Sequence, residues 1–227
     1  MKYFRLFGVA LVALCALGAV MAVSASALPT LLPETIATYT GKSTGATELS
    51  RQGGLAAVTC TKATGEGTVE GNRHLGMFKI TFEKCKAGGG PCTGLGAAAE
   101  NILSEGSYHI VFDTLGATLG AAGVAILFLL AAFHFVCNTI IGEVLNTVAA
   151  GGMVLCLIAN PTALTKVFEF KCKGSAGKPE ETKYYNEAGT LVAISPLMSS
   201  ENEKTATEGA QSGNATVEYK EAALLML

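Results

Sequence analysis

The clearest strand signal in this chain is the stretch Met77-Phe-Lys-Ile-Thr-Phe-Glu-Lys-Cys85. Positions 78, 80 and 82 in it are apolar, whereas positions 79, 81 and 83 are polar. Successive side chains of a β-strand point to opposite faces, so this period of two is typical of a half-buried strand. The segment Val167–Lys173 repeats the pattern, with Phe168, Phe170 and Cys172 on its apolar face.

Further strands are predicted on both sides of these two segments. The stretch from 28 to 54, rich in Thr, Ser, Gly and Pro, predicts one or two short strands with turns. Other short strands are predicted at Ala57–Thr61, Tyr108–Phe112, Leu191–Ile194 and Thr216–Lys220. Glycine-containing clusters separate the predicted strands and indicate turns; they include Gly65-Glu-Gly67, Gly88-Gly-Gly90 and Ser212-Gly-Asn214.

Helical signals are rare in this sequence. The segment Ala97–Leu103 predicts one short helix, and no other part of the chain beyond residue 27 shows a sustained period of 3.6. Many short strands with turn signals between them predict a mainly β fold, an antiparallel β-sandwich or barrel with little helix apart from the N-terminal segment.

The long apolar run Leu115–Val136 has two interpretations. It has 22 residues, which is enough for a helix that spans a bilayer, and its only polar side chains are those of Thr118 and His134. Glycines near its start, and the strand-like residues before it, favour a turn region at Leu115–Gly123 followed by a long buried strand at Val124–Cys137. A membrane-anchored protein with a span at 115–136 stays open as the alternative.

Residues 1–27 have the three parts of a signal peptide. Lys2 and Arg5 supply positive charge, an uncharged apolar stretch follows, and Ala25-Ser-Ala27 offers the small side chains that signal peptidase accepts. We expect cleavage between Ala27 and Leu28, and therefore a secreted or cell-surface bacterial protein. An uncleaved membrane anchor is the alternative.

The mature chain, 28–227, is predicted to be a single disulfide-stapled β domain. The stretches Phe82-Glu-Lys-Cys-Lys and Phe168-Glu-Phe-Lys-Cys-Lys resemble each other, which indicates either an internal duplication or the same strand–turn pattern arising twice. In the case of a duplication, the domain would consist of two weakly similar halves, about 28–115 and 116–227.

Six cysteines follow the predicted cleavage site, and an even number in an exported chain indicates disulfides. They are Cys60, Cys85, Cys92, Cys137, Cys156 and Cys172. Six cysteines allow 15 pairings; of these we expect Cys85–Cys92, Cys60–Cys137 and Cys156–Cys172. Each bridge would add about 2–4 kcal/mol, mainly by restricting the unfolded chain. Buried free thiols are the alternative.

The charge of the chain disfavours nucleic-acid binding. The chain has 16 basic and 18 acidic residues, a net charge of −2 at pH 7. Removal of Lys2 and Arg5 with the signal peptide leaves 14 basic residues against the same 18 acidic ones, a net charge of −4. A nucleic-acid-binding protein needs a basic face to displace counterions, and this composition offers none.

One motif suggests catalysis. Gly41-Lys-Ser-Thr-Gly45 matches the G-x-S-x-G nucleophile elbow of α/β-hydrolases, and Asp113 and His134 follow Ser43 in the order of that fold. The elbow requires a helix after the serine, whereas Gly53-Gly54 ends the segment that follows it here. We therefore predict no catalytic residue, and an exported serine hydrolase centred on Ser43 is kept as an alternative.

A family resemblance extends over essentially the whole chain. It is carried by segments such as Thr38-Tyr-Thr-Gly-Lys-Ser-Thr-Gly45, Pro91-Cys-Thr-Gly-Leu-Gly96 and Phe133-His-Phe-Val-Cys137. On these residues the chain resembles a family of uncharacterised exported actinobacterial (Solirubrobacterales-type) proteins. The resemblance implies an exported, mostly β protein with a strand rather than a span at Val124–Cys137, and it implies no catalytic residue.

These observations together favour a non-enzymatic role. We expect a secreted or cell-surface β protein that acts by binding or as a structural component of the cell envelope. The sequence predicts no cofactor, no metal site and no membrane span in the mature chain, and it identifies no ligand or partner.

Overall fold

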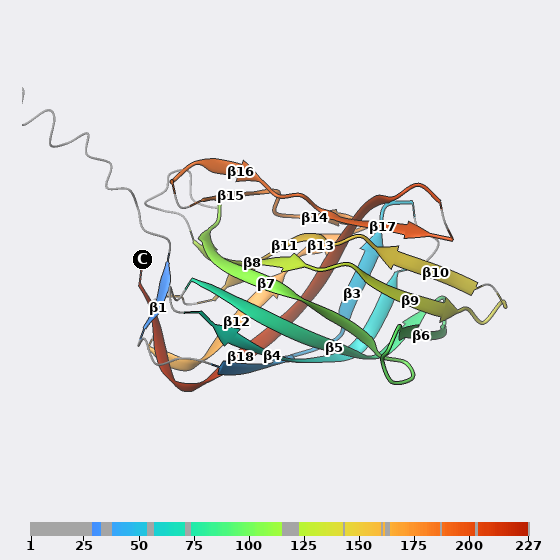
Figure 1. The fold of residues 1–227 in the computed structure, drawn as a ribbon, viewed down its shortest axis with the longest axis horizontal. Coiled ribbons are helices and arrows are strands. Elements are labelled where there is room, and N and C mark those ends of the chain that lie inside the picture. The colour runs from blue at the N-terminus through green and yellow to red at the C-terminus, as the bar shows by residue number, and fades with distance from the viewer. Residues whose placement is uncertain are drawn as a thin grey trace, which may run out of the picture.

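The computed structural model describes residues 29–32, 38–53, 57–70, 74–114, 123–142, 144–159, 161, 164–186, 188–202 and 204–226. These residues form β-strands and connecting turns, with no helix among them, so the prediction of a mainly β, antiparallel fold is confirmed. The strands run obliquely around the long axis of the molecule (Figure 1). The predicted signal segment, 1–27, lies outside the described residues, as does its cleavage site at Leu28.

Eighteen strands are present in the described ranges. The first nine are β1 (Thr30–Leu32), β2 (Thr38–Ser43), β3 (Thr47–Arg51), β4 (Val58–Val69), β5 (Leu75–Ala87), β6 (Gly90–Gly94), β7 (Ile102–Phe112), β8 (Val124–Leu130) and β9 (Phe133–Asn138). The remaining nine are β10 (Val144–Ala149), β11 (Gly152–Ile158), β12 (Thr165–Cys172), β13 (Gly174–Ser175), β14 (Lys178–Pro179), β15 (Lys183–Tyr185), β16 (Leu191–Ala193), β17 (Leu197–Glu201) and β18 (Thr207–Met226).

Antiparallel pairing closes one set of eight strands into a ring. The order is β7, β8, β11, β12, β18, β2, β4 and β5, and β5 pairs with β7 to complete it. We call this the first ring. Closure satisfies the backbone hydrogen bonds at both sides of every strand, which an open sandwich does not achieve.

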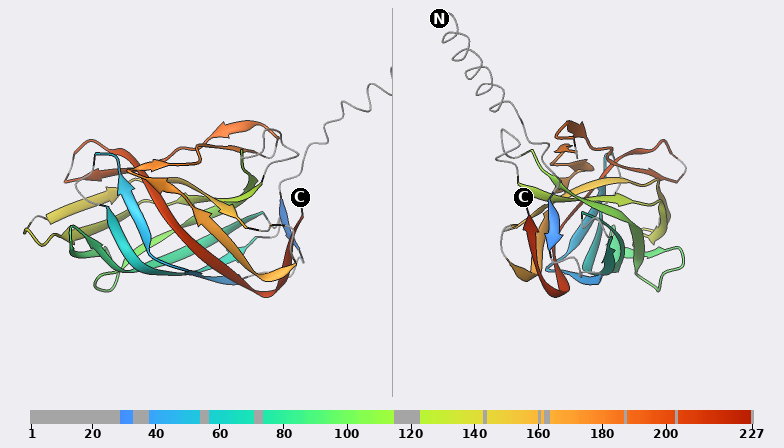
Figure 2. Two further views of the ribbon diagram at one scale, coloured as in Figure 1. Left: turned by 180° about the vertical axis from the view of Figure 1, so that it is seen from behind. Right: turned by 60° about the vertical axis from the view of Figure 1, so that its left-hand side comes forward.

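A second ring of eight strands closes in the same way. Its order is β18, β17, β10, β9, β6, β5, β4 and β3, and β3 pairs with β18. The long strands β4, β5 and β18 belong to both rings, so the two rings lie end to end on a common wall. Seen from behind, β18 crosses the molecule obliquely beside β3 (Figure 2).

Each ring encloses its own apolar core. The core of the first ring contains Phe78, Phe128 and Phe168, and the core of the second contains Phe82 and Phe135. Ile80 and Phe133 pack against both cores, so the interior is continuous where the rings meet, a level we call the waist. The apolar face predicted for Met77–Cys85 thus supplies both cores.

The strict alternation of β5 ends at the waist. Lys84 has a positive φ of 54°, and after it the inward positions change from even to odd, so Cys85 is fully buried instead of facing outward. A single residue in the left-handed conformation within a strand is typical of a β-bulge, which increases local twist. Here the bulge lets one strand contribute inward residues to two successive rings.

Three glycines in the first ring make room for aromatic rings. Gly76 lies opposite Tyr108, and a Cβ on Gly76 would lie 1.9 Å from the Thr68 carbonyl oxygen and 2.5 Å from the Tyr108 ring. In the same way Gly67 lies opposite Tyr39, and Gly106 opposite Phe78. The prediction of a turn at Gly65-Glu-Gly67 was therefore wrong, because these glycines lie inside β4, where the adjacent side chains fill their space. The turn predicted at Ser212-Gly-Asn214 likewise lies inside β18.

All six cysteines predicted to form disulfides do so, but two of the three expected pairings were wrong. The bridges are Cys60–Cys85, Cys92–Cys137 and Cys156–Cys172, and each joins residues directly opposite one another on neighbouring strands. Only Cys156–Cys172 was predicted correctly.

The reason for the two wrong pairings is the order of the strands. Cys60, Cys85, Cys92 and Cys137 lie on β4, β5, β6 and β9, which are consecutive neighbours in the second ring. The expected Cys60–Cys137 bridge would join the two outer members of this row across two intervening strands. The spacing of the cysteines along the chain does not show this order of strands, because β6 and β9 become neighbours only when the second ring closes.

The apolar run after residue 114 is not one strand. Residues 115–122 lie outside the described residues, and the predicted strand Val124–Cys137 is divided at Ala131-Ala132 into β8 and β9. β8 pairs with β7 and β11 in the first ring, whereas β9 pairs with β10 and β6 in the second. The break is therefore where the chain passes from one ring to the other.

The two helices considered from the sequence, at Leu115–Val136 and Ala97–Leu103, are not present in the described residues. The described part of the run Leu115–Val136 is extended, which contradicts a spanning helix there, and no helix in the described ranges has the length and apolarity to cross a bilayer. The short helix predicted at Ala97–Leu103 is a turn followed by the start of β7. Its turn is held by Thr93, whose hydroxyl oxygen accepts a hydrogen bond from the Glu100 amide at 3.0 Å.

The two predicted halves of the chain are joined in both rings. The first ring takes β2, β4, β5 and β7 from the first half and β8, β11, β12 and β18 from the second. The second ring is likewise composed of four strands from each half. A duplication of the sequence stays a prediction, but each core depends on both halves.

Candidate functional site

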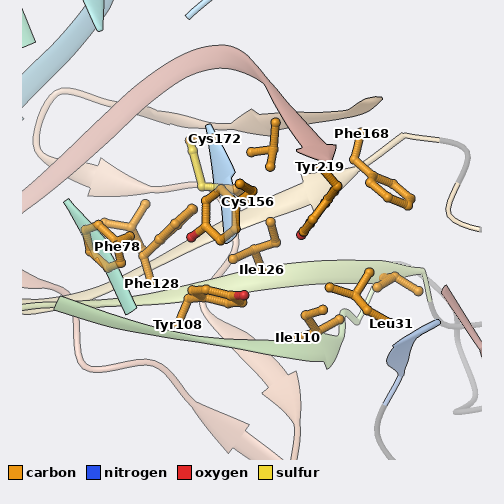
Figure 3. Packing of buried hydrophobic residues seen from close by; sticks show 14 of the residues in the cluster. Leu31, Phe78, Tyr108, Ile110, Ile126, Phe128, Cys156, Phe168, Cys172 and Tyr219 are labelled. Atoms are coloured by element: carbon orange, nitrogen blue, oxygen red, sulfur yellow. A yellow bond between two sulfur atoms is a disulfide. The ribbon is translucent and has the colours of Figure 1, made fainter. Parts of the chain in front are cut away.

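An internal cavity of about 80 Å³ lies in the first ring. Its walls are inward-facing residues of the ring strands, mostly aromatic and aliphatic: Phe78, Phe128, Phe168, Phe170, Ile126, Ile158 and Val217. The pleat of β5, β8, β11, β12 and β18 directs these side chains inward, because every second residue of a strand faces the same side. The close view in Figure 3 shows this packing around Ile126.

Three tyrosines are grouped in the wall of the cavity. The ring of Tyr39 lies 5.8 Å from that of Tyr108 in an edge-to-face arrangement and 5.5 Å from that of Tyr219. Tyr219 in turn packs edge-to-face against Phe168 at 5.7 Å. Such pairs contribute about 0.5–1.5 kcal/mol beyond the area they bury. The group joins β2, β7, β12 and β18 from inside.

The three hydroxyl groups differ in their partners. The Tyr39 hydroxyl donates to the Met77 carbonyl at 3.4 Å, and the Tyr108 hydroxyl donates to the Thr68 carbonyl at 3.2 Å. Tyr219 is only 6% exposed, and its hydroxyl makes no hydrogen bond to any described residue. In Figure 3 the hydroxyl groups of Tyr108 and Tyr219 point into the space around Ile126. The Tyr219 side chain thus directs a hydroxyl group, which can donate and accept a hydrogen bond, toward the cavity.

The opposite end of the cavity, near the waist, is also polar. The buried hydroxyl oxygen of Thr47 has no hydrogen-bond partner, whereas that of Ser43 accepts a hydrogen bond from the Ala63 amide at 2.8 Å. The space is therefore apolar along its middle, with the hydroxyl group of Tyr219 toward one end and that of Thr47 toward the other. A polar group left unsatisfied in a protein interior costs about 1–3 kcal/mol.

The size of the cavity limits what it can hold. A water molecule needs about 10–15 Å³ of such volume, so 80 Å³ accepts roughly five to eight non-hydrogen atoms. This is below the roughly 300–1,000 Å³ of a site for a drug-sized molecule. An eight-stranded ring is known to be just wide enough for its side chains or one small ligand.

Two open grooves on the surface share residues with the cavity. One, of about 1010 Å³, lies over β2, β4, β5 and β18 and includes Tyr39, Phe78 and Tyr219. The other, of about 680 Å³, includes Cys172 and Gly213 near the waist.

Burial sets the ionisation of the three tyrosines. Burial raises the pKa of Tyr39, Tyr108 and Tyr219 above the ordinary value of 10.0, and the neighbouring Tyr219 raises the pKa of the other two further. A desolvated phenolate is costly, so all three groups stay protonated well into the alkaline range.

We expect these tyrosines to ionise only when the protein unfolds. Below about pH 10 both the folded and the unfolded chain keep the phenolic protons, and stability does not depend on them. Above it the unfolded chain releases protons first, so the free energy of unfolding falls as pH rises. In an alkaline titration followed by phenolate absorbance and by circular dichroism, the phenolate absorbance of these three tyrosines should therefore appear only as the native dichroism is lost. Full phenolate absorbance with native dichroism would contradict this expectation.

The residues of the hydrolase hypothesis do not form a catalytic group. Ser43 ends β2, and the chain continues through a turn into β3 instead of the helix that a nucleophile elbow requires. The Ser43 hydroxyl is bonded to Ala63, and the ring of His134 is bonded to the Asn146 side chain on β10. The Asp113 carboxylate accepts a hydrogen bond from the Gly123 amide at 3.0 Å at the end of the first ring.

The tyrosine group was not found from the sequence, although part of the signal is there. A period of two across Thr38–Ser43 and Thr216–Lys220 places Tyr39 and Tyr219 on inward faces. What the sequence does not show is that β2 and β18, which lie at opposite ends of the chain, are neighbours. Only that pairing brings Tyr39 and Tyr219 together.

Comparison of this chain with known protein families, with curated proteins and with solved structures finds no match.

Proposed function

We propose that this chain is an exported binding protein whose site is the cavity of the first ring. Three disulfides within one chain are typical of proteins that work in an oxidising compartment, which supports the export predicted from residues 1–27. Retention at the cell surface, as a component of the envelope, belongs to the same proposal. The net charge of −4 expected for the mature chain disfavours nucleic acid as the partner.

The ligand that suits this cavity is a small, mainly apolar molecule with one hydrogen-bonding group. The walls supply aromatic and aliphatic surface, which favours apolar atoms. The observation that carries the proposal is the Tyr219 hydroxyl, which belongs to a buried side chain, points toward Ile126 and makes no hydrogen bond to another described residue. A ligand hydroxyl or carbonyl placed there satisfies it, whereas an entirely apolar ligand does not.

Phenol is the probe that tests this proposal, and benzene is its apolar control. Phenol has seven non-hydrogen atoms and fits the roughly five to eight that the cavity accepts. We expect saturable chemical-shift changes of the Ile126 and Val217 methyl groups as phenol is added to the exported protein. We expect weaker binding of benzene, by roughly two- to tenfold, because it makes no hydrogen bond.

The variant Tyr219→Phe identifies the contact. It keeps the shape of the side chain, so benzene affinity should be unchanged while phenol affinity falls to that of benzene. Absence of any saturable methyl shift with both probes would refute the cavity as a site. Equal loss of both ligands in Tyr219→Phe would refute the role of the hydroxyl.

Gly41→Ala gives a second, independent test of the cavity. A Cβ on Gly41 would meet only ordinary contacts, 3.5 Å from the Thr216 carbonyl oxygen and 3.7 Å from the Val217 side chain. We expect the variant to fold and to be more stable by about 0.4–1 kcal/mol, because alanine restricts the unfolded chain. Its methyl group occupies the cavity wall, so phenol should bind more weakly. Gly45→Ala, which has nothing within 4 Å, is the matched control and should leave phenol affinity unchanged.

A further inference from the structure

The second ring contains a separate polar cavity. It has a volume of about 40 Å³ and lies against β3, β10 and β17. Its wall combines apolar residues of the second core, such as Leu49 and Phe135, with the inward-facing polar residues Arg51 and Glu201. Its lining residues differ from those of the tyrosine-lined cavity, and the inference that follows does not rest on the proposed function.

Glu201 is a charged residue in an interior position. It is 5% exposed, and one oxygen of its carboxylate, Oε1, is buried and without a hydrogen-bond partner. The register of β17 with β10 places it directly opposite Thr147, on the inward face of both strands. The alternation of β17, in which Leu197 and Ser199 are also buried, fixes this orientation.

Arg51 presents hydrogen-bond donors to the same cavity, where Glu201 presents an acceptor. Its Nε and Nη1 atoms are both buried and without a hydrogen-bond partner. Arg51 lies on the inward face of β3, opposite Gly209 of β18. Two nitrogen donors and one carboxylate oxygen therefore line one space of about 40 Å³.

Leaving both groups unsatisfied is costly, because desolvated charges need partners with good geometry. The partner that satisfies both is a group that accepts hydrogen bonds from a guanidinium and donates one to a carboxylate. It is neutral, since the formal charges of Arg51 and Glu201 already cancel. By the scale of about 10–15 Å³ for each water-sized unit, 40 Å³ accepts roughly three to four non-hydrogen atoms.

We propose that this cavity is a second binding site, which takes a primary carboxamide group. The carbonyl oxygen of a carboxamide accepts from the Arg51 nitrogens, and its NH₂ group donates to Glu201 Oε1. The three heavy atoms of the group, carbon, oxygen and nitrogen, match the volume. The ligand is either a free small amide or the amide end of a larger molecule that enters the ring.

Acetamide is the probe, and the exported protein with its disulfides intact is the sample. The Nε–H signal of Arg51 in a ¹H–¹⁵N spectrum reports contact with the carbonyl group. We expect a saturable shift of this signal with acetamide and none with N,N-dimethylacetamide, which has no N–H donor for Glu201. Equal shifts with both compounds, or no saturable shift, would overturn the proposal.

The variant Glu201→Gln tests the carboxylate, and Glu218→Gln, at an exposed position of β18, is the matched control. Loss of the charge-assisted hydrogen bond should weaken acetamide binding by about tenfold, with no change in the control. If Glu201→Gln does not fold, a crystal structure of the unaltered protein grown with acetamide tests the proposal instead. Amide density between Arg51 and Glu201 supports the proposal, whereas a direct ion pair, or water alone, overturns it.

Discussion

Replacing Gly76 by alanine should lower the free energy of unfolding by about 3–5 kcal/mol, near the upper limit for a single substitution. The new Cβ would lie 1.9 Å from the Thr68 carbonyl oxygen, which belongs to the backbone of β4 and cannot turn aside. It would also lie 2.5 Å from the ring of Tyr108, which fills the space above Gly76. Relief of both contacts requires β4 and β5 to separate, and both strands belong to both rings.

Thermal and urea unfolding of the variants Gly76→Ala and Gly45→Ala, measured under the same conditions, tests this expectation. Gly45 has nothing within 4 Å, so its variant carries the same change of composition without the steric conflict. We expect a small effect in Gly45→Ala and a large fall in the unfolding midpoint of Gly76→Ala. Similar midpoints for the two variants would show that Tyr108 does not lie over Gly76.

The second large effect is expected from the disulfide with the longest loop. The bridge Cys92–Cys137 closes 45 residues, whereas Cys60–Cys85 closes 25 and Cys156–Cys172 closes 16. In the chain-entropy description, the stabilisation grows slowly with loop length and is about 4 kcal/mol for the longest loop and about 3 kcal/mol for the shortest. Removal of Cys92–Cys137 should therefore destabilise the protein most.

This order is tested with double Cys→Ala variants of each pair, so that no lone thiol is left to form a new bridge. The midpoint of urea unfolding should fall most for the Cys92/Cys137 variant and least for the Cys156/Cys172 variant. All six half-cystines are buried, so their replacement also removes packing, by a similar amount in each pair. The reverse order of the three midpoints would contradict the pairing described here.

Local patterns in the sequence predicted much of the secondary structure. The period of two in Met77–Cys85 and Val167–Lys173 placed Phe78, Phe82 and Phe168 correctly in the interior. Patterns of this kind depend only on neighbours along the chain, which the sequence lists directly. The strand β11, Gly152–Ile158, was not predicted, because its apolar run follows two glycines and lacks alternation.

Long-range pairing was not predictable in the same way. No pattern within a short stretch of sequence indicates that β18 is shared by two rings, or that β6 lies beside β9. The errors in the disulfides follow from this, since Cys85 and Cys92 are close in sequence but bridge to Cys60 and Cys137. The error at Gly65-Glu-Gly67 has the same origin, because the aromatic side chain that explains Gly67 is Tyr39, on β2.

The candidate site was missed for a related reason. The motif that attracted attention, Gly41-Lys-Ser-Thr-Gly45, lines the cavity with its glycine Gly41 and its serine Ser43, and Ser43 is already bonded to Ala63. The residues that define the cavity are tyrosines, which have no distinctive spacing because they come from β2, β7 and β18. Sequence patterns find residues that act together only when they are close in the chain.

Mapping the disulfides tests whether the two rings share β4 and β5, with Cys60, Cys85, Cys92 and Cys137 on consecutive strands of the second ring. Under denaturing, non-reducing conditions trypsin cleaves after Lys84 and Lys86, which releases the dipeptide Cys85-Lys86. Mass spectrometry of the exported protein should find this dipeptide bridged to the peptide 52–62, which contains Cys60. A dipeptide bridged instead to the peptide 87–166, which contains Cys92, would contradict the order of strands and the second ring with it.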